Sequence, residues 1–268
     1  MPRTRFVLIE TSHAGNVGAV ARAMKVMGFD DLVLVRPRWP DVLQRDEAVE
    51  RSSGATDVLA RARVVETLDE ALEGMTHLCA TAMTPRDFGP PTRQPREHLS
   101  RWHDEPGLAQ GSGGVAFLFG SERYGMRNDD VYRCHVCLSI PTAPDYGSLN
   151  LAAAVQLVAY EWRLALGGFG PVPAKRAVAG ASALTPPAGS ALEGPDADPC
   201  ADAQALGGLL AHWQEALVAV DFLDPAAPKK LMPRLNQLLN RAQPTEAEVH
   251  ILRGVARAML RVADRAKR

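Results

Sequence analysis

The sequence predicts an α/β domain, with a mostly parallel sheet covered by helices on both faces, followed by a small all-helical unit. Short apolar runs alternate with helical patterns through residues 1–166. These runs show no polar alternation, which is typical of strands buried on both faces. Beyond about residue 200 only helical periodicity remains. We therefore expect three parts: an α/β domain at 1–166, a flexible linker at 167–200 and a helical unit at 201–268.

The strands are expected where the apolar runs lie, at residues 5–10, 32–35, 77–83, 115–120 and 136–140. Helices are expected at about 16–27 and near 66–73. A longer helix from Ser148 ends the domain near Leu166. Its start is polar, but the helix itself is apolar nearly all the way round, which leaves open what covers its second face.

The linker prediction rests on composition. Gly, Pro, Ala and Ser dominate residues 167–199, and such a segment cannot bury enough apolar surface to offset the entropy of ordering it. In the tail, helical periodicity covers residues 205–223, 229–242 and 245–268, with Thr245 as the expected N-cap and Glu248 completing a capping box. The tail has 10 Lys and Arg against 7 Asp and Glu, a net charge of +3.

The net charge, the cysteine count and the lengths of the apolar runs argue against several classes of protein. The whole chain is nearly neutral, with 30 Lys and Arg against 31 Asp and Glu, so global charge does not indicate a nucleic-acid partner. Four unevenly spaced cysteines do not form a disulfide framework, which favours a reducing cytoplasm. No apolar run reaches the roughly 18 residues that span a bilayer, so neither membrane insertion nor secretion is expected.

Two stretches place polar residues after predicted strands. In "ETSHAGNVGAVARAMKVMGF", Arg22 projects on the side of the helix opposite its apolar face, beside the small residues Gly18 and Ala19, which would let a ligand or another chain approach it. A solvated surface arginine is the simpler interpretation. In "VAFLFGSERYGM", Gly120 ends a buried strand and Glu122 follows in a turn, at the edge where open parallel sheets bind ligands.

Two other kinds of site are considered and set aside. The glycines at 15, 18 and 28 do not form the G-x-G-x-x-G fingerprint, and "LVLV" runs into Arg36 rather than an acidic residue, so a nicotinamide-dependent oxidoreductase is disfavoured. Cys134 and Cys137 form a Cys-x-x-Cys pair, but no second pair completes a four-ligand site. We therefore expect structural cysteines and no metal.

Three stretches together resemble a known family. In order and spacing, "GNVGAVARAMKVMGF", "FLFGSERYGM" and "IPTAPDYGSLNLAAAVQLVAYE" are similar to the three motifs of SPOUT-class RNA 2′-O-methyltransferases, and within them to the TrmJ-type tRNA methyltransferases. "ILRGVARAML" near the end resembles the TrmJ-type C-terminal region.

The resemblance implies a deep trefoil knot, one of the rare exceptions to unknotted topology. It also implies a homodimer through the knot region, which would place the second face of the long helix against a partner subunit. S-adenosylmethionine is the implied cofactor, lodged largely among backbone groups. The implied cofactor-binding residues are Thr81, Ala82, Met83, Gly120, Ile140, Gly147, Ser148 and Leu149.

The implied catalytic residues, which should converge where the ribose hydroxyl meets the methyl group, are Asn16, Arg22, Glu122, Ser148 and Asn150. The family's usual assignment makes Arg22 the base. A guanidinium stays protonated in almost any site, so we expect Arg22 to orient the ribose and a phosphate, while phosphate or water takes the proton. The implied RNA-binding residues are Arg22, Arg123, and the stripe Arg253, Arg257, Arg261 and Arg265, for which a solvated helix face is the alternative.

The function implied by the resemblance is 2′-O-methylation of a cytidine or uridine at position 32 of the tRNA anticodon loop. Two alternatives stay open: a knotted RNA-binding protein without catalysis, and a methyltransferase acting on ribosomal RNA. The sequence does not choose between cytidine and uridine.

Overall fold

The protein is described here by a computed structural model covering residues 2–82, 87, 89–101, 113–169 and 200–266. Within these residues seven strands form one sheet in the order β3-β2-β1-β6-β4-β7-β5, and every neighbouring pair is parallel. The strands are β1 (Arg3–Ile9), β2 (Asp31–Val35), β3 (Arg63–Val65), β4 (His77–Thr81), β5 (Thr92–Arg93), β6 (Gly114–Phe119) and β7 (Val136–Leu138). The predicted α/β class with a parallel sheet is confirmed.

The central strands are apolar along their whole length because both faces of the sheet are covered. Val7 of β1 pairs with Val33 of β2 on one side and with Leu118 of β6 on the other, and all three are fully buried. One hydrophobic core lies on each face. The absence of polar alternation in the sequence was therefore a correct sign of a doubly covered sheet.

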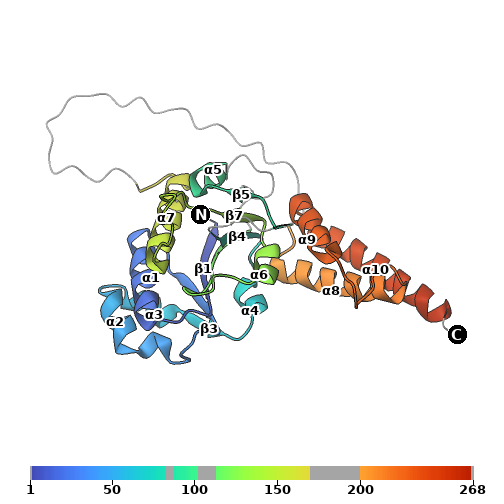
Figure 1. Ribbon diagram of the computed structural model, residues 1–268, viewed down its shortest axis with the longest axis horizontal. Helices are drawn as coiled ribbons and strands as arrows, with labels where there is room; N and C mark the ends of the chain where they lie inside the picture. Colours follow the sequence, from blue (N-terminus) through green and yellow to red (C-terminus); the bar gives the residue numbers. More distant parts are fainter. Residues whose placement is uncertain (1, 83–86, 88, 102–112, 170–199, 267–268) are drawn as a thin grey trace, which may run out of the picture.

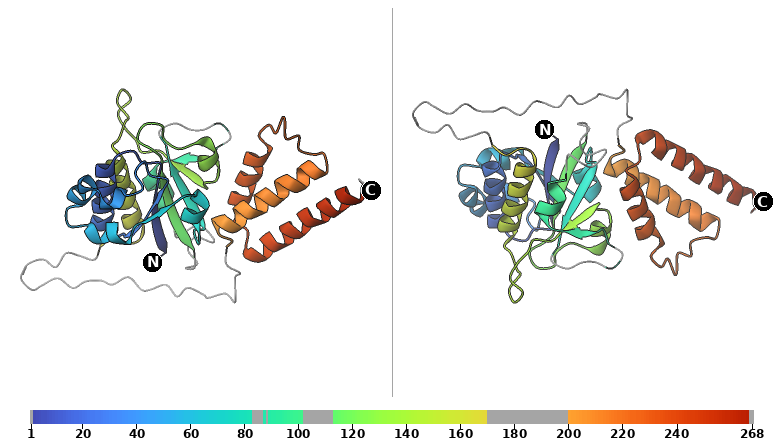
Figure 2. Two further views of the ribbon diagram at one scale, coloured as in Figure 1. Left: turned by 90° about the horizontal axis from the view of Figure 1, so that it is seen from below. Right: turned by 90° about the horizontal axis from the view of Figure 1, so that it is seen from above.

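Helices cover both faces, as Figures 1 and 2 show. On one side lie α1 (Ala14–Val26), α2 (Asp46–Ser52), α3 (Thr56–Arg61), α5 (Pro95–Leu99) and α7 (Leu151–Ala165), with the short 3-10 turn η1 (Val42–Gln44). On the other side lie α4 (Leu68–Leu72), α6 (Asn128–Tyr132) and the start of α8 (Ala203–Ala219).

The long apolar helix begins later than expected. The sequence placed its start at Ser148, but α7 begins at Leu151 and Asn150 is the N-cap, with its side chain accepting a hydrogen bond from the Ala152 N–H at 2.9 Å. Asn150 has the extended backbone that an N-cap needs. Ser148 is exposed in the preceding loop.

The two faces of α7 differ. Its inner residues are buried against the sheet, among them Val155, Val158 and Trp162, each 0% exposed. Its outer face is also apolar but uncovered in the single chain, with Leu157 42%, Tyr160 44% and Leu164 47% exposed.

The tail consists of α8, α9 (Leu231–Ala242) and α10 (Glu246–Ala266), which extend to one side of the sheet in Figure 1. The predicted capping box is confirmed, since the Glu248 N–H donates to Thr245 Oγ1 and the Thr245 N–H donates to Glu248 Oε2 at 2.8 Å. Two buried amides of α9 hold the tail to the sheet domain. Asn240 donates to the carbonyls of Arg133 and Cys134 at 3.2 and 3.0 Å, and Asn236 donates to the carbonyl of Tyr132.

Crossing a bilayer takes a helix both long and apolar, and none of the helices in the described part of the chain meets both conditions.

Candidate active site

The loops after β1 and β6 meet at Glu122. Its carboxylate accepts four hydrogen bonds: from Thr11 Oγ1 at 3.0 Å, from the Ser12 N–H and Oγ at 2.9 Å each, and from Asn16 Nδ2 at 2.8 Å. Thr11 and Ser12 follow β1 directly, and Asn16 lies in the first turn of α1. Four donors saturate the carboxylate, so this side chain is locked in one orientation.

The four donors also fix the charge of Glu122. Partial burial opposes its ionisation, but the hydrogen bonds from Asn16 and Ser12 outweigh burial and lower the pKa of Glu122 from 4.5 to about 2. Glu122 is therefore a stable anion at neutral pH.

The network continues to the start of α7. Asn16 donates to Glu122, and its own Oδ1 accepts from Asn150 Nδ2 at 3.1 Å. Asn150 is the N-cap of α7. The structure therefore links Asn16, Glu122 and Asn150, one from each of the three motifs that the sequence singled out.

Gly120 permits the turn that presents Glu122. Ser121 and Gly125 close the turn through two backbone hydrogen bonds of 3.2 and 2.8 Å. A Cβ at position 120 would lie 2.2 Å from the Gly125 carbonyl carbon. The backbone of the loop itself therefore occupies the space that a side chain at position 120 would need.

The predicted cofactor-binding residues follow adjacent strands. Thr81 is the last residue of β4 and Ala82 follows it, Gly120 follows β6, and Ile140 lies two residues after β7, so all lie at the carboxyl ends of the neighbouring strands β6, β4 and β7. Two hydrogen bonds tie these ends together: Thr81 Oγ1 donates to the Leu118 carbonyl at 2.9 Å, and the Ala82 N–H donates to the Leu138 carbonyl at 3.1 Å. Residues 147–149 stand in the loop before α7, and Met83 lies outside the described residues.

Arg22 and Ser148 are not joined to this network. Both are exposed, and neither makes a hydrogen bond or ion pair with the described residues. Gly18, which was expected to leave space around Arg22, has a different role in the structure. Gly18 is buried, and a Cβ there would lie 2.0 Å from the Ala48 carbonyl oxygen, so its size serves the contact between α1 and α2.

A cleft of about 730 Å³ opens beside the network, at the carboxyl ends of β1, β2 and β6. The order of the strands reverses here, because β2 and β3 are added on one side of β1 and the later strands lie on the other, and such switch points are where parallel sheets bind ligands. Ser12 and Glu122 line the cleft together with Arg38, Arg123 and Tyr124. The sequence analysis missed Arg38 and Tyr124, although Arg38 stands three residues after the end of β2, a position that could have indicated it.

These cleft residues suit a polyanionic aromatic ligand. Tyr124 is 77% exposed, and the Arg123 guanidinium lies 5.3 Å from its ring centre. Neither Arg38 nor Arg123 forms an ion pair with the described carboxylates. Arg36, which also lines the cleft, is held by Glu10 at 3.1 Å.

The predicted basic stripe on α10 is shorter than expected. Arg257, Arg261 and Arg265 are exposed, but Arg253 is partly buried and its guanidinium packs over Gly208 of α8. On the same helix Ala256 is fully buried, while its neighbour Val255 is 46% exposed.

The Cys-x-x-Cys pair has the structural character expected for it. Cys134 and Cys137 are each 1% exposed in the core on the α4 and α6 side of the sheet, and neither is in a disulfide. Burial raises the pKa of the Cys134 thiol, which makes it unreactive at neutral pH.

Comparison with known families decides the assignment. Residues 3–160 match the SpoU rRNA Methylase family, and residues 204–268 match the C-terminal domain of tRNA methyltransferase TrmJ. The chain belongs to the SpoU methylase family. The resemblance to TrmJ-type SPOUT methyltransferases is thereby confirmed for both the sheet domain and the tail.

Similar proteins match this SpoU methylase along nearly its whole length. It is 39% identical over 264 residues to "tRNA (cytidine/uridine/adenosine-2'-O-)-methyltransferase TrmJ" of Pseudomonas aeruginosa, covering 98% of this chain and 96% of that protein. It is 38% identical over 251 residues to "tRNA (cytidine/uridine-2'-O-)-methyltransferase TrmJ" of Cronobacter sakazakii, covering 94% of this chain and 93% of that protein.

Two solved structures resemble the fold. TrmJ from Z. mobilis ZM4 superposes with a TM-score of 0.74 at 30% identity, covering 97% of this chain and 99% of that one. A probable methyltransferase from Bordetella pertussis Tohama I has a TM-score of 0.56 at 47% identity, covering 62% of this chain and 96% of that one.

Proposed function

We propose that this SpoU methylase uses S-adenosylmethionine to methylate the 2′-hydroxyl of a cytidine or uridine in the tRNA anticodon loop. The observation that carries the proposal is that one chain matches both the methylase family and the TrmJ C-terminal domain. Relatives 36–39% identical over almost all of this chain carry tRNA 2′-O-methyltransferase names. A tRNA substrate also supports a cytoplasmic location.

The edge formed by β6, β4 and β7 fits the cofactor. Ile140 after β7 is partly exposed, and Leu149 in the loop before α7 is 39% exposed, so both offer apolar surface for an adenine ring next to backbone groups. When bound, S-adenosylmethionine supplies an activated methyl group whose sulfur leaves with the bonding electron pair. We assign its binding to the residues predicted above, Thr81, Ala82, Met83, Gly120, Ile140 and 147–149.

Glu122 serves as a positioning residue. A carboxylate with a pKa of about 2 is a weak proton acceptor, and its four hydrogen bonds leave no lone pair aimed at a substrate. Its role is to hold Asn16, and through Asn16 the side chain of Asn150, at the edge where the ribose is bound. Alignment of the reacting atoms is the main demand of an in-line displacement.

Arg22 supplies positive charge for the RNA. Its guanidinium stays protonated and is exposed without a partner among the described residues, so it is available to a phosphate and to the oxygen that gains negative charge. The proton of the 2′-hydroxyl passes to water or to a phosphate of the RNA. Ser148 lies in the loop that would hold the cofactor and contributes its hydroxyl there.

A homodimer explains the apolar outer face of α7. Leu157, Tyr160 and Leu164 project from this face, and Val26 of α1, 57% exposed, adds to the apolar surface of the sheet domain. In such a dimer Arg22 of one subunit can approach the cofactor of the other. We also propose that residues 114–165 form the trefoil knot of the SPOUT class. Ultracentrifugation of Leu164→Glu against wild type tests the dimer.

RNA contacts are assigned to two surfaces. Arg38, Arg123 and Tyr124 line the cleft beside Glu122, where phosphates and a stacked base would fit. Arg257, Arg261 and Arg265 on α10 provide a second, sequence-independent phosphate surface. The domain division at 1–166, 167–200 and 201–268 then separates a catalytic part from an accessory RNA-binding part.

The test is methyl transfer to defined RNA. The purified chain is incubated with labelled S-adenosylmethionine and either tRNA or ribosomal RNA, and the digested nucleosides are identified by mass spectrometry. We expect 2′-O-methylcytidine or 2′-O-methyluridine from tRNA. Label in ribosomal RNA alone would favour the ribosomal alternative. Binding of tRNA without transfer would favour an inactive RNA-binding protein.

A further inference from the structure

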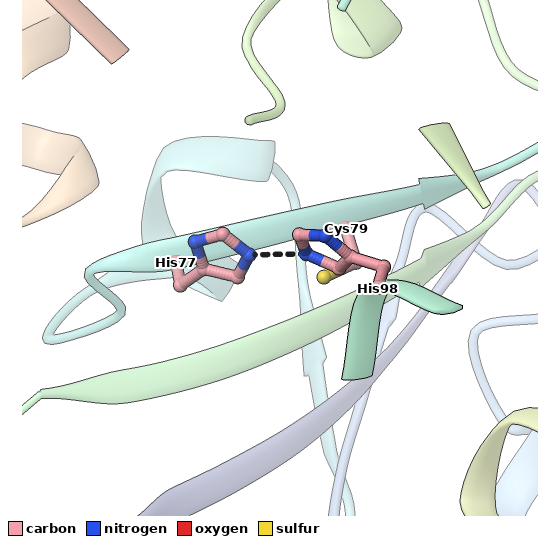
Figure 3. A group of neighbouring side chains, drawn as sticks. All are labelled: His77, Cys79 and His98. Atoms are coloured by element: carbon pink, nitrogen blue, oxygen red, sulfur yellow. Dashed lines mark hydrogen bonds between the residues drawn. The ribbon is translucent and has the colours of Figure 1, made fainter. Parts of the chain in front are cut away.

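Two histidines and a cysteine cluster under α5. His77 and Cys79 are two residues apart on β4 and so point to the same face of the sheet, where His98 of α5 meets them. Nε2 of His77 and Nε2 of His98 are 3.0 Å apart, and the ligand atoms of the three side chains lie within 4.8 Å of one another. Figure 3 shows the two rings facing each other through these nitrogens, with the Cys79 sulfur beside the His98 ring.

We propose that His77, Cys79 and His98 form a zinc site. Nitrogen and sulfur ligands of a tetrahedral zinc ion lie roughly 3.4–3.6 Å from one another, given metal distances of about 2.0 Å to nitrogen and about 2.3 Å to sulfur. The two nitrogens are already near that separation, and because all the ligand atoms lie within 4.8 Å of one another, the sulfur needs to move by about 1.4 Å at most. Two imidazoles with one thiolate are ligands that zinc prefers.

The facing nitrogens of the cluster suit a bound cation. His77 and His98 are 2% and 7% exposed, so their rings are held in place by the packing around them. In the hydrogen-bonded pair one Nε2 carries the proton that the other accepts. A zinc ion would take the place of that proton, which would move to Nδ1 of the same ring, and both Nε2 lone pairs would then point to the metal. The thiol of Cys79 would lose its proton to solvent on binding.

Access and a fourth ligand come from the adjoining cavity. His77 and His98 line a cavity of about 820 Å³ between the sheet and α9. Three protein ligands with one open position leave room for a water molecule from this cavity.

The guanidinium of Arg93 disfavours a metal ion on His98, and a substitution of Arg93 therefore tests the proposed site. Its Nη1 lies 3.4 Å from His98 Nδ1. With a metal on Nε2, Nδ1 carries a proton, so the guanidinium must turn away into the cavity that it also lines. Replacing Arg93 with glutamine removes the charge and supplies an oxygen that can accept from Nδ1. Arg93→Gln should therefore bind zinc more tightly than the wild type does.

The site would join β4 to α5. Cys79 stands two residues before Thr81, so the ion would fasten the strand whose carboxyl end is assigned to the cofactor to the helix that packs against α7. A structural clamp of this kind predicts stabilisation by the metal, whether or not the chain methylates tRNA.

The experiment is a titration of the full chain, freed of metal by a chelator and of any affinity tag, with Co²⁺ under anaerobic conditions. We expect one equivalent to bind with a thiolate-to-cobalt charge-transfer band and the visible bands of tetrahedral cobalt, and Zn²⁺ to displace it. Cys79→Ser should remove the charge-transfer band, and His98→Gln should weaken affinity at least 10-fold, because the loss of even an outer-shell partner of a ligand typically costs about 10- to 100-fold. Cys137→Ser, a buried cysteine in the core on the opposite face, is the matched control and should retain both.

Circular dichroism of each variant establishes that it is folded, and Zn²⁺ should raise the melting temperature of wild type and Cys137→Ser but not of Cys79→Ser. A hydrogen-bonded histidine pair without a metal predicts no stoichiometric cobalt binding and no thermal shift, and either result overturns the proposal. A charge-transfer band that survives in Cys79→Ser also overturns it.

Discussion

Replacing Glu122 with glutamine tests whether the charged network is what holds the three motifs together. Both carboxylate oxygens accept two hydrogen bonds each. A glutamine would turn an NH₂ group toward donors at one of these positions. If Asn16 flipped its amide to accept from that group, its nitrogen would face the donating nitrogen of Asn150. Flipping Asn16 would therefore move the unfavourable contact between two donors to Asn150 and would not remove it.

The pKa of Glu122 sets the expected size of the effect. It falls from 4.5 in its ordinary state to about 2, and at about 1.4 kcal/mol for each pKa unit this gives an upper value of about 3.4 kcal/mol. Glu122 is only partly buried, and solvent screening reduces the expected loss at neutral pH to about 1–2 kcal/mol. Urea unfolding of the full chain measures this loss. The control is Glu10→Gln, which should lose less because Glu10 is paired with the exposed side chains of Arg36 and Arg127.

The sign of the pH dependence is fixed by the direction of the shift. Because the folded-state pKa is depressed, the stabilisation is fully present above pH 4.5 and is lost as the pH falls toward about 2. The difference between wild type and Glu122→Gln should therefore narrow between neutral pH and about pH 3.5. A gap that stays constant over this range, with both proteins folded, would refute the electrostatic argument.

Three other substitutions test separate parts of the structure. Arg22→Ala should lower methyl transfer about 100-fold or more with S-adenosylmethionine affinity nearly unchanged, while Lys25→Ala on the same helix should leave both unchanged; near-normal turnover would remove Arg22 from the mechanism. Gly18→Ala should destabilise the chain by about 1–3 kcal/mol, because its Cβ would overlap a carbonyl of α2, whereas Gly15→Ala, with 3.5 Å to its nearest neighbour, should be close to neutral in thermal melts. Asn240→Leu should cost about 1–3 kcal/mol by leaving two carbonyls without their donor and should speed proteolytic release of the tail, and an unchanged digestion pattern would contradict the docking role.

The strands of the sheet could be predicted from the sequence where their apolar runs are long enough to form a pattern. Its five longer or central strands were found from their apolar runs, but β3 and β5 have three and two residues and stand at the two edges, where no pattern develops. The start of α7 was misplaced because several polar residues precede it, and only the backbone angles single out Asn150 as the cap.

The site was predictable in its residue types but not in its contacts. Asn16, Glu122 and Asn150 were identified from motifs, yet they meet across sequence separations of 106 and 134 residues, which depend on how two loops fold. Gly18 was misjudged because a small residue looks the same whether it faces a ligand or a helix. The cluster of His77, Cys79 and His98 was missed because its spacing matches no familiar metal motif, while the more conspicuous cysteine pair proved to be core.

Asn150 divides its amide between two tasks, since its oxygen closes the first turn of α7 and its nitrogen reaches Asn16. A helix start alone would accept serine, threonine or aspartate. Aspartate has no N–H to give, and the hydroxyl residues are too short to make both contacts at once. Serine, threonine and aspartate, which could replace Asn150 as a helix N-cap, would therefore each lose one of the two contacts. The same side-chain atoms of Asn150 thus serve both the folding of α7 and the proposed reaction.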